Sequence, residues 1–544
     1  MNQTIPCDVL VIGGGGAGLR AAIEAKKLAN KVVLASKGEA GRSGSTMYSG
    51  CSMIATLPTD PEEAFRLHFQ DTLFVGKFLN DPVLVEDLVN RAGEEVLAIE
   101  QMGVKIHKKK GGFLMGRPDD APNPSAVEPD YTGYEFRVRG AALTQPLRKY
   151  ADHMGVQVMD GITILRLIVE DGEITGAVGV DTQIGETYVF AAKAVILASG
   201  GAGQLYAFTS NSPDITGDSY SLALEAGVIL RDMEFVEFNP CRLLFPDMPT
   251  NLPPDLFTYG AVLRNANGER FILNHNPKGE ENSFREEMPR LVYLEVKEGR
   301  GVQGGVYLDA TPIPLDIWET RYPALFTALK NQGVDPQKDY LIFGVRANMF
   351  AGGVKITRQG ESNISGLFAV GEAAGGVHGA KRFGGNSVAH TLVSGAITGR
   401  AAAWHAQKRR KIPDLQGHVE NGFVKRSGTL SVEEVSQHLR RSMWENVSFV
   451  RSEASLQKAR ADIQACRKAL EDCRIDDLAD WLQYKITCGM CLVAETITAS
   501  ALYRKESRGP HYREDYPNQD KGWLGSVEVQ KIGSDLALSF KPKT

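Results

Sequence analysis

Residues 8–18, Asp-Val-Leu-Val-Ile-Gly-Gly-Gly-Gly-Ala-Gly, decide the fold of this chain. The apolar run at 8–12 is typical of a buried strand, and residues 19–28 have the pattern of a helix. Between them Gly13, Gly15 and Gly18 permit a tight turn, close approach of a pyrophosphate and close helix packing, respectively. The helix N-terminus would direct its positive dipole end at that pyrophosphate. The residues expected at the dinucleotide are Gly13, Gly15, Gly16, Ala17 and Gly18.

A second strand is expected at residues 31–35, which completes a strand–turn–helix–strand unit of parallel α/β type. The acidic residue that binds the ribose in many NAD sites is absent, and Ser36 stands at the end of this strand. A hydroxyl can still bind a ribose, so Ser36 is expected at the nucleotide. The departure argues against plain NAD binding.

The composition of the whole chain excludes several classes of function. The chain has 544 residues, enough for two to four domains, and a formal net charge of −5. This charge gives no case for binding nucleic acid or an anionic membrane. We expect no signal peptide and no membrane-spanning run. Seven cysteines in a chain of this size predict no disulfide framework, and hence a reducing, cytoplasmic location.

The remaining sequence divides by pattern into five further regions. Alternating segments around 158–192 predict a small antiparallel sheet, and residues 194–198 a buried strand. Scattered aromatics with many Pro and Asn near 230–350 are typical of an inserted lid. A strand at 366–370 and a helix after Asn386 return to the α/β pattern. Residues from 414 to about 505 are helical in pattern, and the end of the chain has strand character.

Six segments outside the glycine turn carry further motifs. They are Val-Leu-Ala-Ser-Lys-Gly-Glu-Ala-Gly-Arg-Ser-Gly-Ser-Thr at 33–46, Ala-Ser-Gly-Gly-Ala-Gly at 198–203, Thr-Gly-Asp-Ser at 216–219, Gly-Gly-Val-Tyr-Leu-Asp at 304–309, Gly-Glu-Ala-Ala-Gly-Gly-Val-His-Gly-Ala-Lys-Arg at 371–382 and Glu-Ser-Arg-Gly-Pro-His-Tyr-Arg at 506–513. In this order they resemble the flavoprotein subunits of the fumarate reductase/succinate dehydrogenase superfamily, which also includes the L-aspartate oxidase and adenylylsulfate reductase flavoproteins. The resemblance covers nearly the whole chain.

The resemblance implies an α/β fold with three domains and a tail. We expect a Rossmann-like FAD-binding domain at 1–230 and 352–413, an inserted α+β capping domain at 231–351, a helical domain at 414–505 and a C-terminal tail at 506–544. Glu372 is expected to hold the ribityl hydroxyls, although by itself it could be a buried carboxylate paired with an arginine. Ser387 and Val388 are expected to offer backbone N–H groups to the pyrimidine end of the flavin. The other residues expected at FAD are Lys37, Ser43, Gly44, Ser45, Ser49, Gly50, Ser199, Gly200, Gly201, Asp218, His378, Arg382 and Asn386.

Gly44 bears on how the flavin is attached. Covalent members of the family carry a histidine in an Arg-Ser-His-Thr segment, and the matching run here is Arg42-Ser43-Gly44-Ser45-Thr46. Gly44 has no side chain to attach. Noncovalent FAD is therefore expected.

Two arginines match the family's substrate site. Arg290 ends the run Arg285-Glu-Glu-Met-Pro-Arg290, which resembles the family's Arg-Asp-x-x-x-Arg, and Glu286 stands in place of the aspartate. The resemblance implies that Arg290 transfers a proton while hydride moves at the flavin, and that Arg382 grips a substrate carboxylate. Without the resemblance, a structural salt bridge would be the simpler reading of either arginine.

Two asparagines stand where the family has substrate histidines. Asn239 lies in Glu237-Phe-Asn-Pro-Cys241, which replaces Gln-Phe-His-Pro-Thr, and Asn348 begins the segment that replaces His-x-x-x-Gly-Gly. Only Arg382 clearly survives as a charged clamp, whereas a dicarboxylate needs two. A monocarboxylate, an enone or another neutral acceptor therefore fits better than fumarate, succinate or aspartate. The residues expected to act on substrate are Arg290, Arg382, Glu286, Asn239 and Asn348.

Three functions remain open from the sequence. The first is oxidation or reduction of a C–C bond with electrons exchanged with a ferredoxin-like iron–sulfur subunit, since no four-cysteine cluster motif is present in the chain. The second is sulfur-oxyanion reduction of the adenylylsulfate reductase type, and the third is a non-catalytic flavoprotein scaffold. Retention of Arg290 favours the first. Cys488-x-x-Cys491 could be a redox dithiol, but two packed core cysteines are the simpler reading.

Overall fold

The computed structural model describes residues 3–49, 52–110, 134–137, 140–245, 252, 254–277, 279–280, 287–409, 411–415 and 422–543. The chain divides into two compact units. The first includes the chain up to Glu237, apart from a short insertion at 113–127, and resumes at Met349. The described part of the second lies between Phe238 and Asn348. The inserted domain was expected at 231–351, which is wider at both ends than the stretch 238–348 of the second unit. The strand at 236–245 begins in the first unit, and the strand at 341–350 ends in it.

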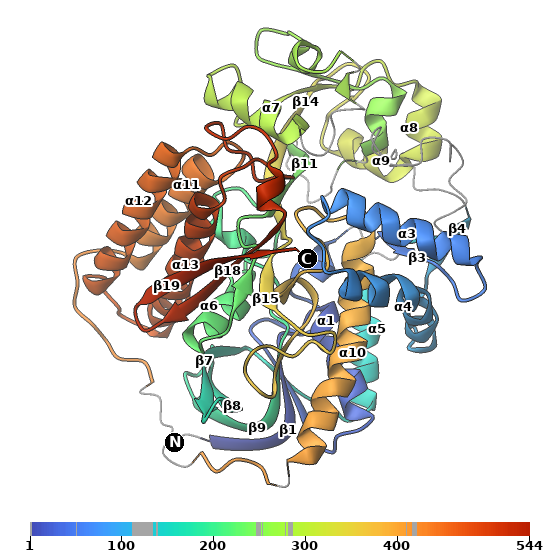
Figure 1. Ribbon diagram of the computed structural model, residues 1–544. Coiled ribbons are helices and arrows are strands. Elements are labelled where there is room, and N and C mark those ends of the chain that lie inside the picture. The colour runs from blue at the N-terminus through green and yellow to red at the C-terminus, as the bar shows by residue number, and fades with distance from the viewer. Residues whose placement is uncertain are drawn as a thin grey trace. The chain divides into compact units, whose positions relative to one another are not determined.

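A seven-stranded sheet forms the centre of the first unit (Figure 1). Its order is β6-β2-β1-β9-β8-β7, and β16 pairs with β9 outside this path. The β1, β2, β6, β9 and β16 pairings are parallel, whereas β7, β8 and β9 pair antiparallel as expected for 158–192. The strands are β1 Gln3–Ile12, β2 Val32–Ser36, β6 Gln157–Asp160, β7 Ile162–Glu170, β8 Glu173–Asp181, β9 Thr187–Leu197 and β16 Leu367–Ala369.

Helices pack on this sheet through a continuous apolar core that includes Val11, Leu19, Ile196 and Leu392. The long helix α10 runs beside α1 and crosses β1 and β9 (Figure 1). Gly399 allows this contact, because a Cβ there would lie 2.3 Å from a carbonyl oxygen of α1. The unit also contains the described helices α2 to α6. The bounds of these helices and of α1 and α10 are α1 Gly16–Lys26, α2 Ser45–Tyr48, α3 Glu62–Val75, α4 Pro82–Gln101, α5 Gly140–His153, α6 Asp218–Glu225 and α10 Asn386–Lys408.

The C-terminal part of the chain belongs to the first unit. Three helices pack on one another, and the strands after them join β10, β15 and β17 in a five-stranded sheet of order β17-β15-β10-β18-β19. A three-stranded sheet, β3-β5-β4, completes the unit. The bounds are α11 Val432–Val447, α12 Glu453–Glu471, α13 Leu478–Tyr503, β3 Ser52–Ala55, β4 His107–Lys110, β5 Tyr134–Arg137, β10 Leu230–Arg231, β15 Gly353–Lys355, β17 Ala374–Gly375, β18 Gly525–Ile532 and β19 Asp535–Pro542.

The helix α13 departs from the expectation that no segment could span a membrane. Among the described helices it alone is long and apolar enough, with a mean hydropathy of 1.4 over its most apolar stretch, and 61% of that stretch is buried in the fold. Its Cys491 is fully buried and Cys488 is half-buried. Burial raises the pKa of both thiols, which makes them poor nucleophiles at neutral pH.

The second unit is built on a four-stranded sheet of order β11-β14-β13-β12. The pairs β12–β13 and β13–β14 are antiparallel. Helix α7 packs on β13, and α8 packs on α9 around the buried Trp318. The bounds are β11 Val236–Phe245, β12 Val262–Arg264, α7 Glu287–Lys297, β13 Val306–Asp309, α8 Leu315–Arg321, α9 Pro323–Asn331 and β14 Leu341–Phe350.

Candidate functional site: a flavin site in the first unit

The glycine turn between β1 and α1 has a packed side and an open side. Gly13 has a φ of +118°, and a Cβ on Gly18 would lie 1.9 Å from the Gly13 carbonyl oxygen. Gly15 is open, because the nearest atom to a Cβ there is a hydroxyl oxygen 4.0 Å away. Gly16 and Ala17 begin α1, which has no side-chain cap, so the N–H groups of its first turn remain for a ligand. This geometry fits a pyrophosphate.

Lys37 follows the buried Ser36 at the end of β2. Its Nζ lies 2.7 Å from Asp218 Oδ2 and donates to Thr216 Oγ1 at 2.6 Å. The Thr216 hydroxyl in turn donates to Asp218 at 2.7 Å. The fold thus brings together two of the expected cofactor residues, Lys37 and Asp218, from distant segments. A nucleotide at the end of β2 would lie beside an ion pair rather than an isolated cation.

The segment around α2 returns to the glycine turn. Gly44 has a φ of +83°, and a Cβ there would come no closer than 3.8 Å to another atom. The Ser45 hydroxyl is buried and makes no hydrogen bond within the described residues. The Ser43 hydroxyl donates to the Glu39 carbonyl oxygen at 2.9 Å. An orphaned buried hydroxyl beside an open glycine fits a polar ligand such as FAD.

Two other residues near α2, Ser49 and Gly50, were also expected at FAD. The carbonyl oxygen of Ser49 accepts the N–H of Gly140 at 3.2 Å, which ties the end of α2 to the start of α5. Gly50 lies outside the described residues.

Glu372 lies against the second glycine loop. A Cβ on Gly201 would lie 2.4 Å from Glu372 Oε1, and Phe350 N–H donates to the same oxygen at 3.0 Å. Burial of the carboxyl group raises the pKa of Glu372 to about 7, although the side chain keeps some solvent access. Gly200 has a φ of +79°, and Ser199 N–H donates to a side-chain hydroxyl of α6. A carboxyl group poised between charged and neutral forms can accept hydrogen bonds from ribityl hydroxyls.

Helix α10 begins at Asn386 after Gly385, which has a φ of +85°. No side chain caps this helix, so the backbone N–H groups of Ser387 and Val388 are placed to bind a ligand. The Asn386 side chain itself is turned to α3 and is completely buried. Its Oδ1 lies 2.8 Å from an imidazole nitrogen of α3, and its Nδ2 donates to a threonine hydroxyl of the same helix at 2.9 Å. This side chain therefore fixes the start of α10.

A pair of buried histidines lies beside this helix start. His378 and His390 make an edge-to-face contact with ring centroids 5.1 Å apart. Burial lowers the pKa of His390 to about 4 and that of His378 well below its usual value, so both rings are neutral at pH 7. His378 Nδ1 is buried without a hydrogen-bond partner in the described part of the chain. It is thus free to bind a ligand.

Arg382 faces Glu237 in a loose ion pair. Its Nε lies 3.4 Å from Glu237 Oε2, and both side chains are 15% exposed. Its Nη2 reaches Glu237 Oε1 only at 3.5 Å. Because these contacts are long, the guanidinium keeps donors for the carboxylate of a substrate.

Three of the expected substrate residues belong to the second unit. Asn239 lies near the start of β11 and Asn348 near the end of β14, and these two strands are neighbours in the sheet. Arg290 lies on α7 and is partly exposed. Glu286 lies outside the described residues.

Several residues of the candidate site carried no signal in the sequence. His68 and Thr72 hold the side chain of Asn386, from which they are more than 300 residues away. His390 lies within the apolar pattern of a helix, and Glu237 was noted only as part of a motif. Their roles depend on long-range contacts, so residue spacing could not have revealed them.

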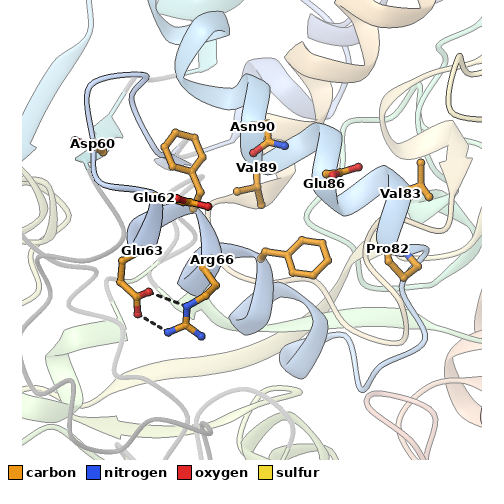
Figure 2. A pocket seen from close by; sticks show the side chains of 11 residues that line it. Asp60, Glu62, Glu63, Arg66, Pro82, Val83, Glu86, Val89 and Asn90 are labelled. Carbon is orange, nitrogen blue, oxygen red and sulfur yellow. Dashed lines mark hydrogen bonds and ion pairs between the residues drawn. The ribbon is translucent and has the colours of Figure 1, made fainter.

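A hollow lies between α3 and α4, and none of the residues of the glycine turn line it (Figure 2). Its volume is 860 Å³. Phe65, Phe69 and Val89 contribute apolar surface, and carboxylates such as Glu62 and Glu86 surround it. Arg66, the one cation among its lining residues, pairs with a glutamate one turn away. This composition suits neither a pyrophosphate nor a carboxylate.

Comparison with known proteins agrees with this geometry. Residues 8–388 match the FAD binding domain family, and residues 436–542 match the fumarate reductase flavoprotein C-terminal family. An uncharacterized FAD-dependent oxidoreductase of Methanocaldococcus jannaschii is 36% identical over 96% of both chains. One of the subunits of the fumarate reductase (CoM/CoB) of Methanothermobacter marburgensis is also 36% identical, over 97% of this chain and 98% of its own.

A solved structure extends the likeness to three dimensions. The FrdA chain of Escherichia coli quinol fumarate reductase superposes with a TM-score of 0.85 at 27% identity, covering 99% of this chain and 97% of its own. The expected α/β fold with an FAD-binding domain, a capping domain and a helical C-terminal domain is therefore confirmed. The chain belongs to the fumarate reductase/succinate dehydrogenase flavoprotein family, and it is an FAD-dependent oxidoreductase.

Proposed function

We propose that this flavoprotein oxidises or reduces a C–C bond next to the carboxylate or carbonyl group of a small organic compound other than fumarate or succinate. The observation that carries the proposal is the combination of Arg382 with Asn239 and Asn348. Arg382 supplies one charged clamp, and its loose pairing with Glu237 leaves it donors for a carboxylate. The two asparagines supply neutral amides at positions where the family has histidines.

The free energy lost when histidine is replaced by asparagine favours a substrate with a single charge. A hydrogen bond to a charged group contributes roughly 1.5–3 kcal/mol. Losing one such bond therefore lowers affinity for a second carboxylate by about one to two decades. Neutral amides bind a carbonyl group without that loss, because they can both donate and accept.

The chain's own residues would act by binding and by proton transfer. FAD supplies the two-electron chemistry. Arg382 would fix the carboxylate, and Glu237 would keep the guanidinium oriented. Arg290 would donate or remove the proton on the carbon next to the one that exchanges hydride.

We also propose that an iron–sulfur protein exchanges electrons with the flavin. The methanogen relative is named as one component of a larger enzyme, which supports an assembly. The single dinucleotide fingerprint is needed for FAD and leaves no second site of that kind for nicotinamide.

Fumarate reduction is the second candidate, and the name of the methanogen relative favours it. The two candidates differ in the substrate that reoxidises the reduced flavin. The test is anaerobic photoreduction of the purified protein, followed by mixing with crotonate, a cyclic enone, fumarate or adenylylsulfate while flavin absorbance is recorded.

Rapid reoxidation by crotonate or the enone, with fumarate below a kcat/KM of about 10⁴ M⁻¹s⁻¹, is the expected result. Efficient reoxidation by fumarate would replace the proposal with the second candidate. Reoxidation by adenylylsulfate alone would indicate sulfur chemistry. A flavin that none of the four reoxidises would count against the proposal and favour a scaffold role.

A further inference from the structure

The loop that follows α3 has an uncommon backbone conformation. Lys77 and Phe78 are both left-handed, with φ of 54° and 59°. Lys77 N–H donates to the Phe74 carbonyl oxygen at 3.0 Å, and Phe78 N–H donates to that of Leu73 at 2.9 Å. This is a Schellman motif in which lysine takes the place usual for glycine. Left-handed residues that carry a Cβ persist only where the surroundings hold them.

One side of this loop is bonded to the segment 376–382, which carries His378 and Arg382. Asp81 N–H donates to the carbonyl oxygen of Gly376 at 2.8 Å. Ala380 N–H donates to the carbonyl oxygen that precedes Lys77, at 2.9 Å. The loop therefore helps to set the position of the proposed carboxylate clamp.

The other side of the loop is bonded to the C-terminal tail. Lys543, just after β19, donates from Nζ to the carbonyl oxygen of Phe78 at 2.6 Å and to that of Asn80 at 3.0 Å. Arg508 makes a longer contact, 3.4 Å, with the carbonyl oxygen of Lys77. Lys543 is half-buried, and its two acceptors lie at the second left-handed residue and two residues beyond it.

We infer that Lys543 is a positioning residue of the flavin site, which holds the left-handed loop and, through it, the segment of His378 and Arg382. Without the ammonium group the two carbonyl groups would turn to water, and the loop would relax toward an unstrained backbone. The hydrogen bonds donated by the Asp81 N–H to the segment 376–382, and by the Ala380 N–H of that segment to the loop, would then weaken. The effect on substrate rests on the proposed role of Arg382, whereas the effect on the loop does not.

The first test is hydrogen exchange on the FAD-loaded full chain. Lys543→Met removes the donors and keeps the apolar stem, and Lys541→Met, at an exposed position on β19, is the matched control. We expect Lys543→Met to speed exchange of the Asp81 and Ala380 amides about tenfold, which equals about 1.4 kcal/mol of local opening. Peptides from β1 and the control variant should stay unchanged. Unaltered exchange in both segments would overturn the inference.

A rescue experiment separates strain from simple loss of contact. Phe78→Gly and Phe78→Ala both remove the ring, which contacts Phe74 edge to face at 6.1 Å. Only glycine also removes the cost of the left-handed conformation. In the Lys543→Met background, Phe78→Gly should restore protection and Phe78→Ala should not. Equal behaviour of the two double variants would refute the strain argument.

The consequence for the site is measured with crotonate as a carboxylate probe, from the change in the visible flavin spectrum. If the loop and the Arg382 clamp are coupled, Lys543→Met should weaken crotonate binding at least about fivefold while FAD content stays unchanged. Adding Phe78→Gly to this variant should restore the affinity. Unchanged affinity despite faster exchange would overturn the positioning role. Absence of crotonate binding to the unaltered protein would contradict the proposed clamp, and the exchange result would then decide the role of Lys543 alone.

Discussion

At the scale of single residues, Gly44 is the basis for the prediction that FAD is bound noncovalently. It offers no side chain at the position where covalent relatives attach the cofactor, and its positive φ suits glycine. We therefore predict that acid precipitation releases all flavin into the supernatant. Flavin fluorescence that stays with the denatured protein band on a gel would contradict noncovalent binding.

Substitutions of Arg290 and Arg382 should affect kcat and KM in different ways. General acid–base groups contribute about 10²–10⁴-fold to rate, so Arg290→Gln should lower kcat by that order with normal FAD content. Arg382→Ala should raise KM first, because it removes a binding contact. Lys297→Gln, at an exposed position on the same helix as Arg290, serves as the control. Near-normal kcat in Arg290→Gln, measured with the true substrate, would remove Arg290 from the mechanism.

Glu372 should give the apoprotein a pH-dependent stability. Its pKa of about 7 in the fold lies above the value of 4.5 expected without burial, so the folded state holds its proton more tightly. The contribution of Glu372 to stability is then greatest below pH 4.5 and is lost as the pH rises through 7, by up to about 3 kcal/mol. Glu372→Gln should flatten this fall.

The measurement is the urea midpoint of the apoprotein between pH 4.5 and 8. Glu62→Gln, at an exposed position on α3, is the control and should follow the unaltered protein. Other titrating groups are present in all three proteins, so only the difference counts. The same slope in Glu372→Gln would show that this carboxyl group is not the source.

The residues predicted from the sequence were those with local motifs. Glycine spacing placed the turn between β1 and α1, because a backbone approach requires glycine at fixed offsets. Partners across the fold were not predictable, as the bond between His68 and Asn386 shows. The left-handed Lys77 was equally hidden, since lysine gives no signal for that conformation.

At the scale of elements, the β1–α1 unit contains two kinds of glycine. A methyl group on Gly18 would collide with a backbone carbonyl of the turn, whereas one on Gly15 would meet only open space. Gly18→Ala should therefore prevent α1 from packing and yield little soluble protein. Gly15→Ala should fold but bind FAD more weakly, because the methyl group occupies the approach to the pyrophosphate.

Circular dichroism and FAD titration distinguish these outcomes. A soluble, flavin-loaded Gly18→Ala protein would contradict the packing argument, and normal FAD affinity in Gly15→Ala would contradict the binding argument. Gly172→Ala is unsuitable as a control because its φ is +78°. Gly422→Ala is suitable, since a Cβ there comes no closer than 4.0 Å to another atom.

The bounds of elements were predicted within a few residues where hydrophobic periodicity was clear. The helix expected at 19–28 is Gly16–Lys26, and the strand expected at 31–35 is Val32–Ser36. The strand character at the chain end is real, but its pairing of β18 with β10 joins residues far apart in sequence. Such pairings depend on the whole core and not on local pattern.

At the scale of the whole molecule, the proposal of an iron–sulfur partner concerns how electrons reach the flavin. The one dinucleotide fingerprint of the sequence is needed for FAD and leaves no second site of that kind for nicotinamide. We therefore predict that NADH and NADPH reduce the purified flavin only slowly. A reduced ferredoxin, as a soluble iron–sulfur donor, should reduce it much faster. Stopped-flow absorbance of the flavin, with iron analysis of the same sample, measures both rates. Fast reduction by NADH would place the nicotinamide on this chain and remove the need for an iron–sulfur partner.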